Sequence, residues 1–487
     1  MLLAGLASYE TGRERPFELA RFDGKSFLHL AGSNAASSSV ALSNSSVGPL
    51  AFADVDGDGE LELFVGGRVV PGRYPEAASS RLLHFEPSGQ FRERAADASL
   101  FKGVGLVSGA IWSDLNGDGF PELVLACEWG PIRVFQNERG QLREATRAWG
   151  LEHFTGWWSG VGAGDFDGDG RLDLVGANWG LNSEYSASAE RPCVTYYGDL
   201  LERGTVDLLE AEWEPVERVL APRQRLDVLA RSLPQLQEKF LTFREFSTAP
   251  MTKLLAPFGD KARRVEAVTL ATTLFLNRGD HFDAMPLPRE AQLAPAFAVT
   301  IADFDGDGQE DLFLSQNCFD LPAPMPRLDG GRGLLLQGNG HGELRPLPAA
   351  TSGIYVHGEQ RGAAVADFDA DGRVDLVVTQ NGGPTRLWKN QSAKPGRRLR
   401  LEGPAGNPSG VGAVVRVKDG GRLGPAHEVH AGSGYWSQDS TVLVLAGTGK
   451  GAELWVRWPG GLETTVPWPA GSADIVLRAP SPGAVSR

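Results

Sequence analysis

Residues 164–175 read GDFDGDGRLDLV, and this stretch decides how the rest of the chain is interpreted. It places four carboxylates, those of Asp165, Asp167, Asp169 and Asp173, within nine residues. The glycines between them permit positive φ angles, so the backbone can curl the carboxylates around one point. Apolar residues follow at once. We therefore expect an acidic loop that leads into a β-strand.

The pattern predicts a site for a hard cation with oxygen ligands. Positions 1, 3 and 5 of the loop supply side-chain oxygens, position 7 its backbone carbonyl, and position 9 a carboxylate able to bind with both oxygens. This ligand count favours Ca²⁺ over Mg²⁺, because Mg²⁺ prefers a small octahedral site that retains several waters. The expected cofactor is Ca²⁺.

Four near-copies of the loop begin at Asp54, Asp114, Asp303 and Asp367. One acidic turn between strands is ordinary turn chemistry, but five copies with oxygens at positions 1, 3, 5 and 9 favour metal binding over bare acidic hairpins. The predicted ligands of about five Ca²⁺ sites are Asp54, Asp56, Asp58, Glu60, Glu62, Asp114, Asn116, Asp118, Phe120, Glu122, Asp165, Asp167, Asp169, Arg171, Asp173, Asp303, Asp305, Asp307, Gln309, Asp311, Asp367, Asp369, Asp371, Arg373 and Asp375.

Two related patterns are excluded. An EF-hand requires glutamate at position 12, where these loops have Val65, Leu125, Gly176, Leu314 and Val378. An altered copy runs from Asp199 to Asp207 but has Leu201 and Arg203 at positions 3 and 5, so we expect it to bind no metal.

The loops begin about 50 to 65 residues apart, which is the length of a four-stranded propeller blade. The longer interval from Asp165 to Asp303 holds the altered copy, which would add one blade. A second sequence pattern recurs at 82–93, 134–145, 274–285 and 334–347. It predicts a strand, a Gly/Asn turn and an outer strand. We expect an all-β fold whose propeller has about seven blades, either all complete or with one incomplete.

Three segments depart from the repeat. Within the predicted propeller at 1–395, residues 214–258 lack glycine and space apolar side chains by three and four, which predicts a short helical insertion. Residues 396–479 alternate like strands without acidic loops, which predicts a small β-sandwich-like domain. Residues 480–487 are expected to be a disordered tail.

The composition excludes several classes of protein. The net charge of −14 is concentrated in the loops, and the absence of a basic patch argues against a nucleic-acid partner. Three cysteines, none in a CxxC pair, cannot form a disulfide framework. No apolar run is long enough to span a membrane. The first residues also lack the basic and long apolar regions of a signal peptide.

At 159–180 and 361–383 the loops with their flanking strands resemble FG-GAP or VCBS repeats, the blades of the integrin α-chain propeller. GVGAVVRV at 410–417, EVHAGSGYWSQ at 428–438 and VRWPGG at 456–461 resemble the ASPIC/UnbV domain, although VLAGTGKG at 444–451 departs from its usual turn. Together they resemble bacterial relatives of cartilage acidic protein. This resemblance implies a Ca²⁺-stabilised, usually secreted propeller with no assigned catalytic activity.

Motifs of catalysis are absent from the sequence. It has no GxSxG elbow, HExxH pair or phosphate loop, and the close pair His427 and His430 would point to opposite faces of a strand. We therefore expect a non-catalytic module for protein interaction or adhesion, extracellular or in the cell envelope, with a protein or glycan partner. The alternative is a lectin or a lyase-like propeller that uses exposed tryptophans among Trp112, Trp129, Trp157, Trp158 and Trp179.

The N-terminus reads as an incomplete blade. MLLAGLASYE at 1–10 resembles the strand after an acidic loop, and 16–32 resembles the two outer strands, but the first strand and loop are missing. Either this half-blade pairs with the strand at 384–390 and closes the ring, or the chain is a fragment whose signal peptide and first blades lie upstream. The missing unit lies at the boundary, which favours the fragment.

Overall fold

The structure, a computed structural model, describes residues 45–86, 91–321, 325–433, 435–447, 451–469 and 474–480. It also gives the backbone of β1 (Leu2–Leu6), β2 (Glu18–Phe22) and β3 (Phe27–His29). The described residues form antiparallel sheets almost throughout, which confirms the predicted all-β class. No helix among them is long and apolar enough to cross a membrane. The predicted tail at 481–487 and the centre of the 444–451 turn lie outside the described residues.

Five sheets carry an acidic loop between their first and second strands, and we number these blades one to five in chain order. Their strands are β4 (Ser46–Ala53), β5 (Glu62–Val69), β6 (Arg81–Phe85) and β7 (Phe91–Glu93); β8 (Leu106–Ser113), β9 (Glu122–Gly130), β10 (Arg133–Glu138) and β11 (Gln141–Glu144), with β12 (Gly156–Trp157) beside β9; β13 (Gly160–Gly164), β14 (Asp173–Ala177), β19 (Thr273–Asn277) and β20 (Phe282–Pro286); β21 (Ala296–Ala302), β22 (Asp311–Gln316), β23 (Leu334–Gly338) and β24 (Leu344–Pro346); and β25 (Glu359–Ala366), β26 (Asp375–Asn381) and β27 (Gly383–Trp388).

The blades pack side by side in chain order through shared apolar cores. The first strands β4, β8, β13, β21 and β25 are consecutive neighbours, so they line the inside of the assembly. Each core joins two successive blades: Phe64 and Phe135 lie in one, and Leu174 and Val124 in the next. The two following cores join blade three to four and blade four to five. This continuous packing is the propeller arrangement expected from the repeat.

Residues 178–272 do not form the blade that was predicted between the third and fourth loops. Their strands β15 (Cys193–Gly198), β16 (Asp207–Glu214), β17 (Val219–Pro222) and β18 (Arg263–Ala267) form a separate sheet in the order β17-β16-β15-β18. Blade three resumes only afterwards, because β14 pairs with β19. The prediction that the Asp199 copy marks a blade is therefore wrong. The described residues hold five loop-bearing blades and the β1-β2-β3 sheet, not seven blades.

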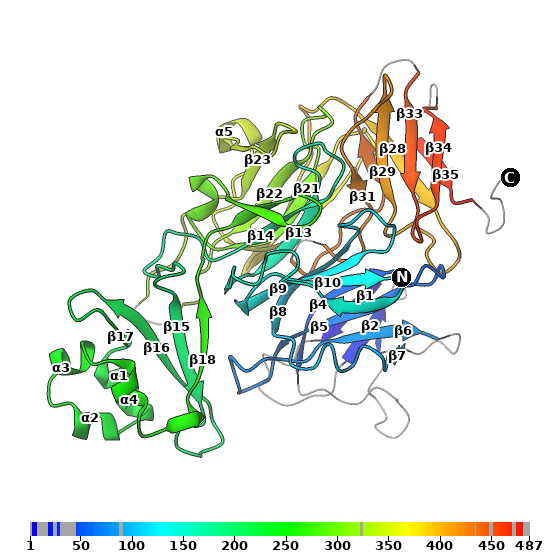
Figure 1. The fold of residues 1–487 in the computed structure, drawn as a ribbon. Helices are drawn as coiled ribbons and strands as arrows, with labels where there is room; N and C mark the ends of the chain where they lie inside the picture. The colour runs from blue at the N-terminus through cyan, green and yellow to red at the C-terminus, as the bar shows by residue number, and fades with distance from the viewer. Residues whose placement is uncertain are drawn as a thin grey trace.

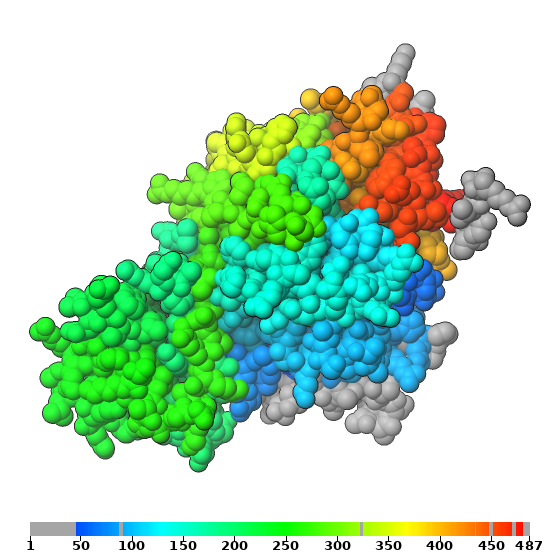
Figure 2. All heavy atoms as spheres, in the orientation of Figure 1, coloured from blue at the N-terminus to red at the C-terminus, as the bar shows by residue number. Residues whose placement is uncertain are grey.

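Helices cover one face of this inserted sheet. They are α1 (Leu226–Ser232), α2 (Gln235–Lys239), α3 (Phe243–Ser247) and α4 (Met251–Leu255), all within the segment predicted to be helical. Leu229, Leu233, Phe240 and Phe246 bury their side chains against Leu209 of β16. We call residues 178–272 the inserted unit; in Figures 1 and 2 it forms the green lobe at lower left.

The first and last blade segments do not pair with each other in the described residues. β2 pairs with β1 and β3, while β27 pairs with β26. The closed blade that would join 17–32 to 384–390 is therefore not formed among these strands. β1 instead lies near β4 of blade one.

The C-terminal domain is built from two sheets. In the first sheet, β28 (Arg397–Glu402) lies between β32 (Leu443–Leu445) and β35 (Asp474–Arg478). In the second sheet, β29 (Val414–Asp419) pairs with β30 (Arg422–Leu423), β31 (His427–Glu428) and β33 (Glu453–Arg457). β33 also pairs with β34 (Glu463–Pro467). Leu399, Val415, Leu454 and Trp458 share the core of the domain. Figure 1 places this domain at upper right, opposite the inserted unit.

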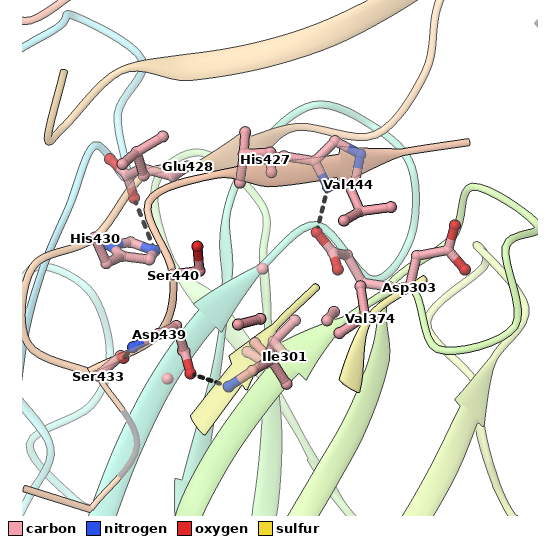
Figure 3. A pocket seen from close by; sticks show the side chains of 18 of the residues that line it. Ile301, Asp303, Val374, His427, Glu428, His430, Ser433, Asp439, Ser440 and Val444 are labelled. Atoms are coloured by element: carbon pink, nitrogen blue, oxygen red, sulfur yellow. Dashed lines mark hydrogen bonds and ion pairs between the residues drawn. The ribbon is translucent and has the colours of Figure 1, made fainter. Parts of the chain in front are cut away.

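One stretch of this domain, residues 426–440, begins in its own sheet, where β31 pairs with β29, and then lies against the inner strands of the propeller. We call it the axial segment. Phe52 of β4 donates its amide to Ala431 (2.7 Å), Trp436 donates its indole N–H to Ser108 of β8 (3.1 Å), and Val365 of β25 donates to Asp439 (2.9 Å). The segment thus lies against the first strands of blades one, two and five, and Figure 3 shows its residues His430, Ser433, Asp439 and Ser440.

Candidate metal centres

The first aspartate of each acidic loop organises the turn from within. In the third loop (165–173), Asp165 accepts hydrogen bonds from the amides of Gly168 (2.8 Å) and Gly170 (2.9 Å). Both glycines have positive φ, 73° and 92°, a conformation that glycine adopts without strain. Equivalent pairs of glycine amides bond to Asp54, Asp114 and Asp303. In the fifth loop Asp367 accepts instead from the amides of Asp371 and Gly372.

Position 9 fastens the loop to its own blade. One carboxylate oxygen of Asp173 accepts from the amide of Phe166 (2.9 Å), and the other accepts from the amide of Asn277 at the end of β19 (2.8 Å). Asp311 and Asp375 make the same two kinds of bond. The position 9 carboxylate is therefore both a predicted ligand and a bridge from the loop to the third strand.

In four loops, carboxylate oxygens from three residues lie within 4.8 Å of one another. They come from positions 1, 3 and 9 in the third and fourth (303–311) loops, and from positions 1, 3 and 5 in the first (54–62) and fifth (367–375) loops. In these four loops the predicted side-chain ligands outside the groups are Asp169 and Asp307 at position 5 and Glu62 and Asp375 at position 9. The second loop is not among these groups, and the position 7 residues, predicted to bind through their backbone carbonyls, lie outside them too. Closely spaced carboxylates repel one another, which opposes gathering all four without a cation.

The second loop (114–122) differs from the others. Its position 3 is Asn116, whose amide nitrogen donates to Asp118 (3.1 Å) and Glu122 (3.2 Å). Asp114 and Glu122 are buried.

Position 7 behaves alike in every loop: its backbone N–H donates to the position 5 carboxylate, at Glu60, Phe120, Arg171, Gln309 and Arg373.

Burial raises the pKa of the carboxyls at positions 1 and 9 of the first four loops. The pKa is raised to about 7 at Asp54, to about 6 at Asp165 and Asp303, and to about 8 at Asp173 and Asp311. Desolvation is the main cause, and neighbouring carboxylates add to it. A divalent cation would reverse this balance, because it supplies the opposite charge on the spot.

The residues present fit Ca²⁺. The donor set is all oxygen, from carboxylates, one amide and the position 7 carbonyls, which is the chemistry that Ca²⁺ takes. Asp167 also has a buried carboxylate oxygen with no hydrogen-bond partner, as an unused ligand atom would have. When bound, Ca²⁺ would neutralise the clustered carboxylates; the residues that would hold it are those at positions 1, 3, 5, 7 and 9.

Asparagines at the ends of third strands link neighbouring loops, a role that the sequence analysis missed. Asn277 donates its amide N–H groups to Leu115 of the second loop (2.8 Å) and Leu172 of its own loop (3.1 Å). Asn137 and Asn390 bridge the preceding loop to their own in the same way. The available signal was the asparagine that ends VFQN, LFLN and RLWKN.

The C-terminal domain lies against all five loops. Arg457 pairs with Asp114 (2.7 Å), Arg398 with Asp367 (3.4 Å), and Ala426 donates its amide to Asp165 (2.9 Å). At the fourth loop, His427 lies 2.6 Å from Glu310. At the first loop, Pro404 packs against Gly59, so closely that a Cβ atom added to this glycine would lie 3.2 Å from the proline ring. The predicted metal sites therefore lie at the interface of the two domains.

The axial segment places ionisable groups in this interface. Glu428 accepts from Ser113 (2.7 Å) and from the amide of Asp114 (3.0 Å), and lies 3.6 Å from His430 (Figure 3). Burial raises the pKa of Glu428 to about 8 and lowers that of His430 to about 4. His427 and His430 have different partners, Glu310 and the Trp112 carbonyl, so they form no joint metal site.

The five tryptophans singled out in the sequence divide into two groups. Trp112 and Trp158 are buried, with 4% and 0% exposure, and pack between blades. Trp129, Trp157 and Trp179 are partly exposed and lie together at the strand ends remote from the acidic loops. We call this side of the propeller the far face.

Comparison with known proteins supports the repeat and the C-terminal domain. Residues 114–176 match the FG-GAP-like repeat family, and residues 403–482 match the ASPIC and UnbV family. No curated protein matches the chain.

Similar solved structures include rhamnogalacturonan lyase YesW, with 12% identity over 93% of this chain and 80% of that one, at a TM-score of 0.31. The exotype rhamnogalacturonan lyase YesX has 15% identity, and the alignment covers 76% of this chain and 65% of that one, at a TM-score of 0.26. The biofilm matrix protein Bap1 of V. cholerae has 13% identity over 87% of this chain and 60% of that one, at a TM-score of 0.25. Scores this low carry no functional argument.

Proposed function

We propose that this chain, which carries an FG-GAP-like repeat and an ASPIC and UnbV domain, is a calcium-stabilised, non-catalytic binding module of the extracellular space or cell envelope. Its acidic loops hold about five Ca²⁺ ions. These ions join the propeller to the C-terminal domain. The face remote from the loops is left for a protein or glycan partner.

The observation that carries this proposal is the position of the loops between two domains. The first aspartates Asp54, Asp114 and Asp165 are nearly or fully buried, and the C-terminal domain lies against every loop. A catalytic metal needs an open coordination position that substrate can reach. Positions 3 and 5 of the first, second and fifth loops are exposed, but the first aspartates of the first three loops are buried and the second domain touches every loop. This position at a domain interface suits a structural ion.

Calcium should contribute substantially to stability. An ion that binds only the folded state adds RT ln(1 + [L]/Kd) to the free energy of unfolding, about 2.7 kcal/mol per site at a hundredfold excess over Kd. Several such sites would make the folded interface depend on calcium. The melting temperature in calcium should therefore exceed that in EDTA by many degrees.

The test is differential scanning calorimetry of the full chain in calcium, in magnesium and in EDTA. We expect a large rise in melting temperature with calcium and a smaller one with magnesium. A melting temperature that is the same in calcium and EDTA would refute the proposal.

The main rival function is a polysaccharide-cleaving propeller. The partly exposed tryptophans of the far face favour contact with sugars but supply no acid–base pair by themselves. Incubation with plant and bacterial polysaccharides, followed by size-exclusion chromatography, distinguishes the two functions. A binding module leaves the chain length unchanged, whereas shortened chains would contradict the non-catalytic role.

A further inference from the structure

Two cavities open beside Trp157, where the inserted unit meets the far face. One, of about 150 Å³, is lined by Trp157, Trp179, Phe297, Tyr435 and the pair Arg68 and Glu128. The other, of about 260 Å³, is lined by Trp129, Trp157, Tyr185, Arg223 and Glu210 among others. We call the two together the aromatic pocket. Strands of the propeller and of the inserted unit both contribute to it.

The rings of the pocket form one connected group. The ring centre of Trp157 lies 4.9 Å from that of Trp129, 5.2 Å from that of Trp179 and 4.7 Å from that of Tyr185, all edge to face. Edge-to-face contacts hold aromatic side chains in fixed orientations. The pocket therefore presents preformed apolar surfaces.

These rings do more than fill an interface. Protein interiors are packed as densely as organic crystals, and few voids exceed the size of a water molecule. Beside these four rings the surface is instead hollowed into two open cavities of about 150 and 260 Å³. Buried Trp112, which lines neither cavity, shows how this chain packs a tryptophan between blades.

Fixed polar groups surround the rings. Arg223 lies over the ring of Tyr185 (4.2 Å) and bonds to Glu212 (2.9 Å), while the hydroxyl of Tyr185 donates to Glu210 (3.0 Å). In the smaller cavity Arg68 pairs with Glu128 (2.5 Å). The indole N–H groups of Trp157 and Trp179 have no hydrogen-bond partner in the described residues, which is unfavourable for a buried donor.

The charges of the pocket do not suit an anion. Arg68 is balanced by Glu128, and Arg223 is outnumbered by Glu184, Glu210 and Glu212, with which it forms ion pairs. The whole chain carries a net charge of −14. Arg191, which also lines the larger cavity, forms no ion pair among the described residues and lies over the ring of Trp213. The linings of both cavities together hold three arginines and four glutamates, so a ligand with carboxylate or phosphate groups gains no net attraction there.

We propose that the aromatic pocket binds a neutral oligosaccharide. The C–H faces of the sugar rings pack against Trp157, Trp179 and Tyr185, and the sugar hydroxyls bond to the Arg and Glu side chains. A sugar ring has apolar C–H faces and hydroxyl groups around its edge. The aromatic rings of the pocket complement the faces, and its charged side chains complement the hydroxyls. The inference rests on the proposed function, because it names the partner of the binding module.

The test uses the full chain in calcium against an array of neutral and acidic oligosaccharides, followed by titration calorimetry with a bound neutral one. We expect Trp157→Ala to weaken binding about tenfold or more, the factor that 1.4 kcal/mol of lost contact produces. Arg223→Lys, which keeps the charge but loses the planar fork, should also weaken binding. Trp388→Ala is the matched control, because Trp388 is a partly exposed tryptophan of blade five remote from the pocket.

The outcomes separate this inference from the proposed function. Binding to a neutral sugar that falls in Trp157→Ala and Arg223→Lys but not in Trp388→Ala supports the pocket. Absence of any neutral ligand, binding to acidic sugars alone, or equal affinity in all variants overturns it. If calcium still raises the melting temperature in those cases, the inference fails and the calcium-stabilised module stands. Without a calcium effect, the proposed function itself fails.

Discussion

At the scale of single residues, the acidic loops combine two tasks in the same carboxylates. Asp165 holds its turn by accepting two glycine amides, and Asp173 bridges its loop to β19, while both are also predicted ligands. Ligand spacing could be predicted from sequence because it depends on residues within nine positions of each other. Which oxygens come together could not, because that depends on burial and on partners such as Asn277 far along the chain.

The first prediction compares Asp165→Ala with Asp199→Ala. Asp199 accepts the amides of Arg203 (2.7 Å) and Gly204 (2.8 Å), so it holds a similar turn, but Arg203 occupies position 5 and pairs with Asp207. We expect native mass spectrometry to find one Ca²⁺ fewer in Asp165→Ala and an unchanged count in Asp199→Ala. Loss of an ion in Asp199→Ala would contradict the assignment.

The second prediction concerns pH. The pKa values of Asp173 and Asp311 are raised to about 8, and that of Asp54 to about 7, so without metal the folded state binds more protons than the unfolded state near neutrality. Stability in EDTA should therefore fall as pH rises from about 6.5 to about 8. The raised pKa of His427 acts in the same direction.

With calcium the trend should weaken or reverse, because the ion binds the deprotonated carboxylates and competes with protons. Urea midpoints measured across this range, in EDTA and in calcium, test the difference. The pKa of His430 is lowered to about 4, so this group makes stability rise with pH. It does so only below about pH 6.5, outside the range in which the carboxyls are tested. EDTA midpoints that stay level or rise with pH would show that the carboxyls are not buried as described.

At the scale of elements, the third strands do more than widen the blades. Asn137, Asn277 and Asn390 each tie a loop to the preceding one, so the loops form a linked series. The strands and loops of each blade could be predicted from local patterns. The inserted sheet could not, because the Asp199 turn keeps the amide bonds of a true loop while its strand β16 pairs outside the propeller.

The third prediction tests this linkage. Asn277→Ala removes three hydrogen bonds from a fully buried side chain: the carbonyls of Leu115 and Leu172 lose that donor, and the amide of Gly279 loses that acceptor. We expect a loss of about 1–3 kcal/mol in the free energy of unfolding, measured by urea denaturation in calcium. Asn339→Ala, at an exposed turn of blade four, is the control and should change little. Equal losses in both variants would argue against the bridge.

At the scale of the whole molecule, the C-terminal domain completes the propeller. Its axial segment bonds to β4, β8 and β25, and its arginines reach the second and fifth loops. The sequence predicted a separate domain because 396–479 contains no repeat. It could not predict the docking, because the partners of the axial segment lie 60 or more residues away on several blades. We infer that calcium and the docked domain stabilise each other.

Hydrogen–deuterium exchange of the full chain, in calcium and in EDTA, tests this claim most directly. The amides of Phe52, Ala426 and Gly460 bond across the interface, whereas those of the inserted sheet, such as Leu209 and Ala211, lie remote from it. The account predicts that EDTA accelerates exchange in the loops and in peptides spanning 426–440 and 460, with the inserted sheet unchanged. Exchange at the axial segment that is equally slow in calcium and in EDTA would contradict it.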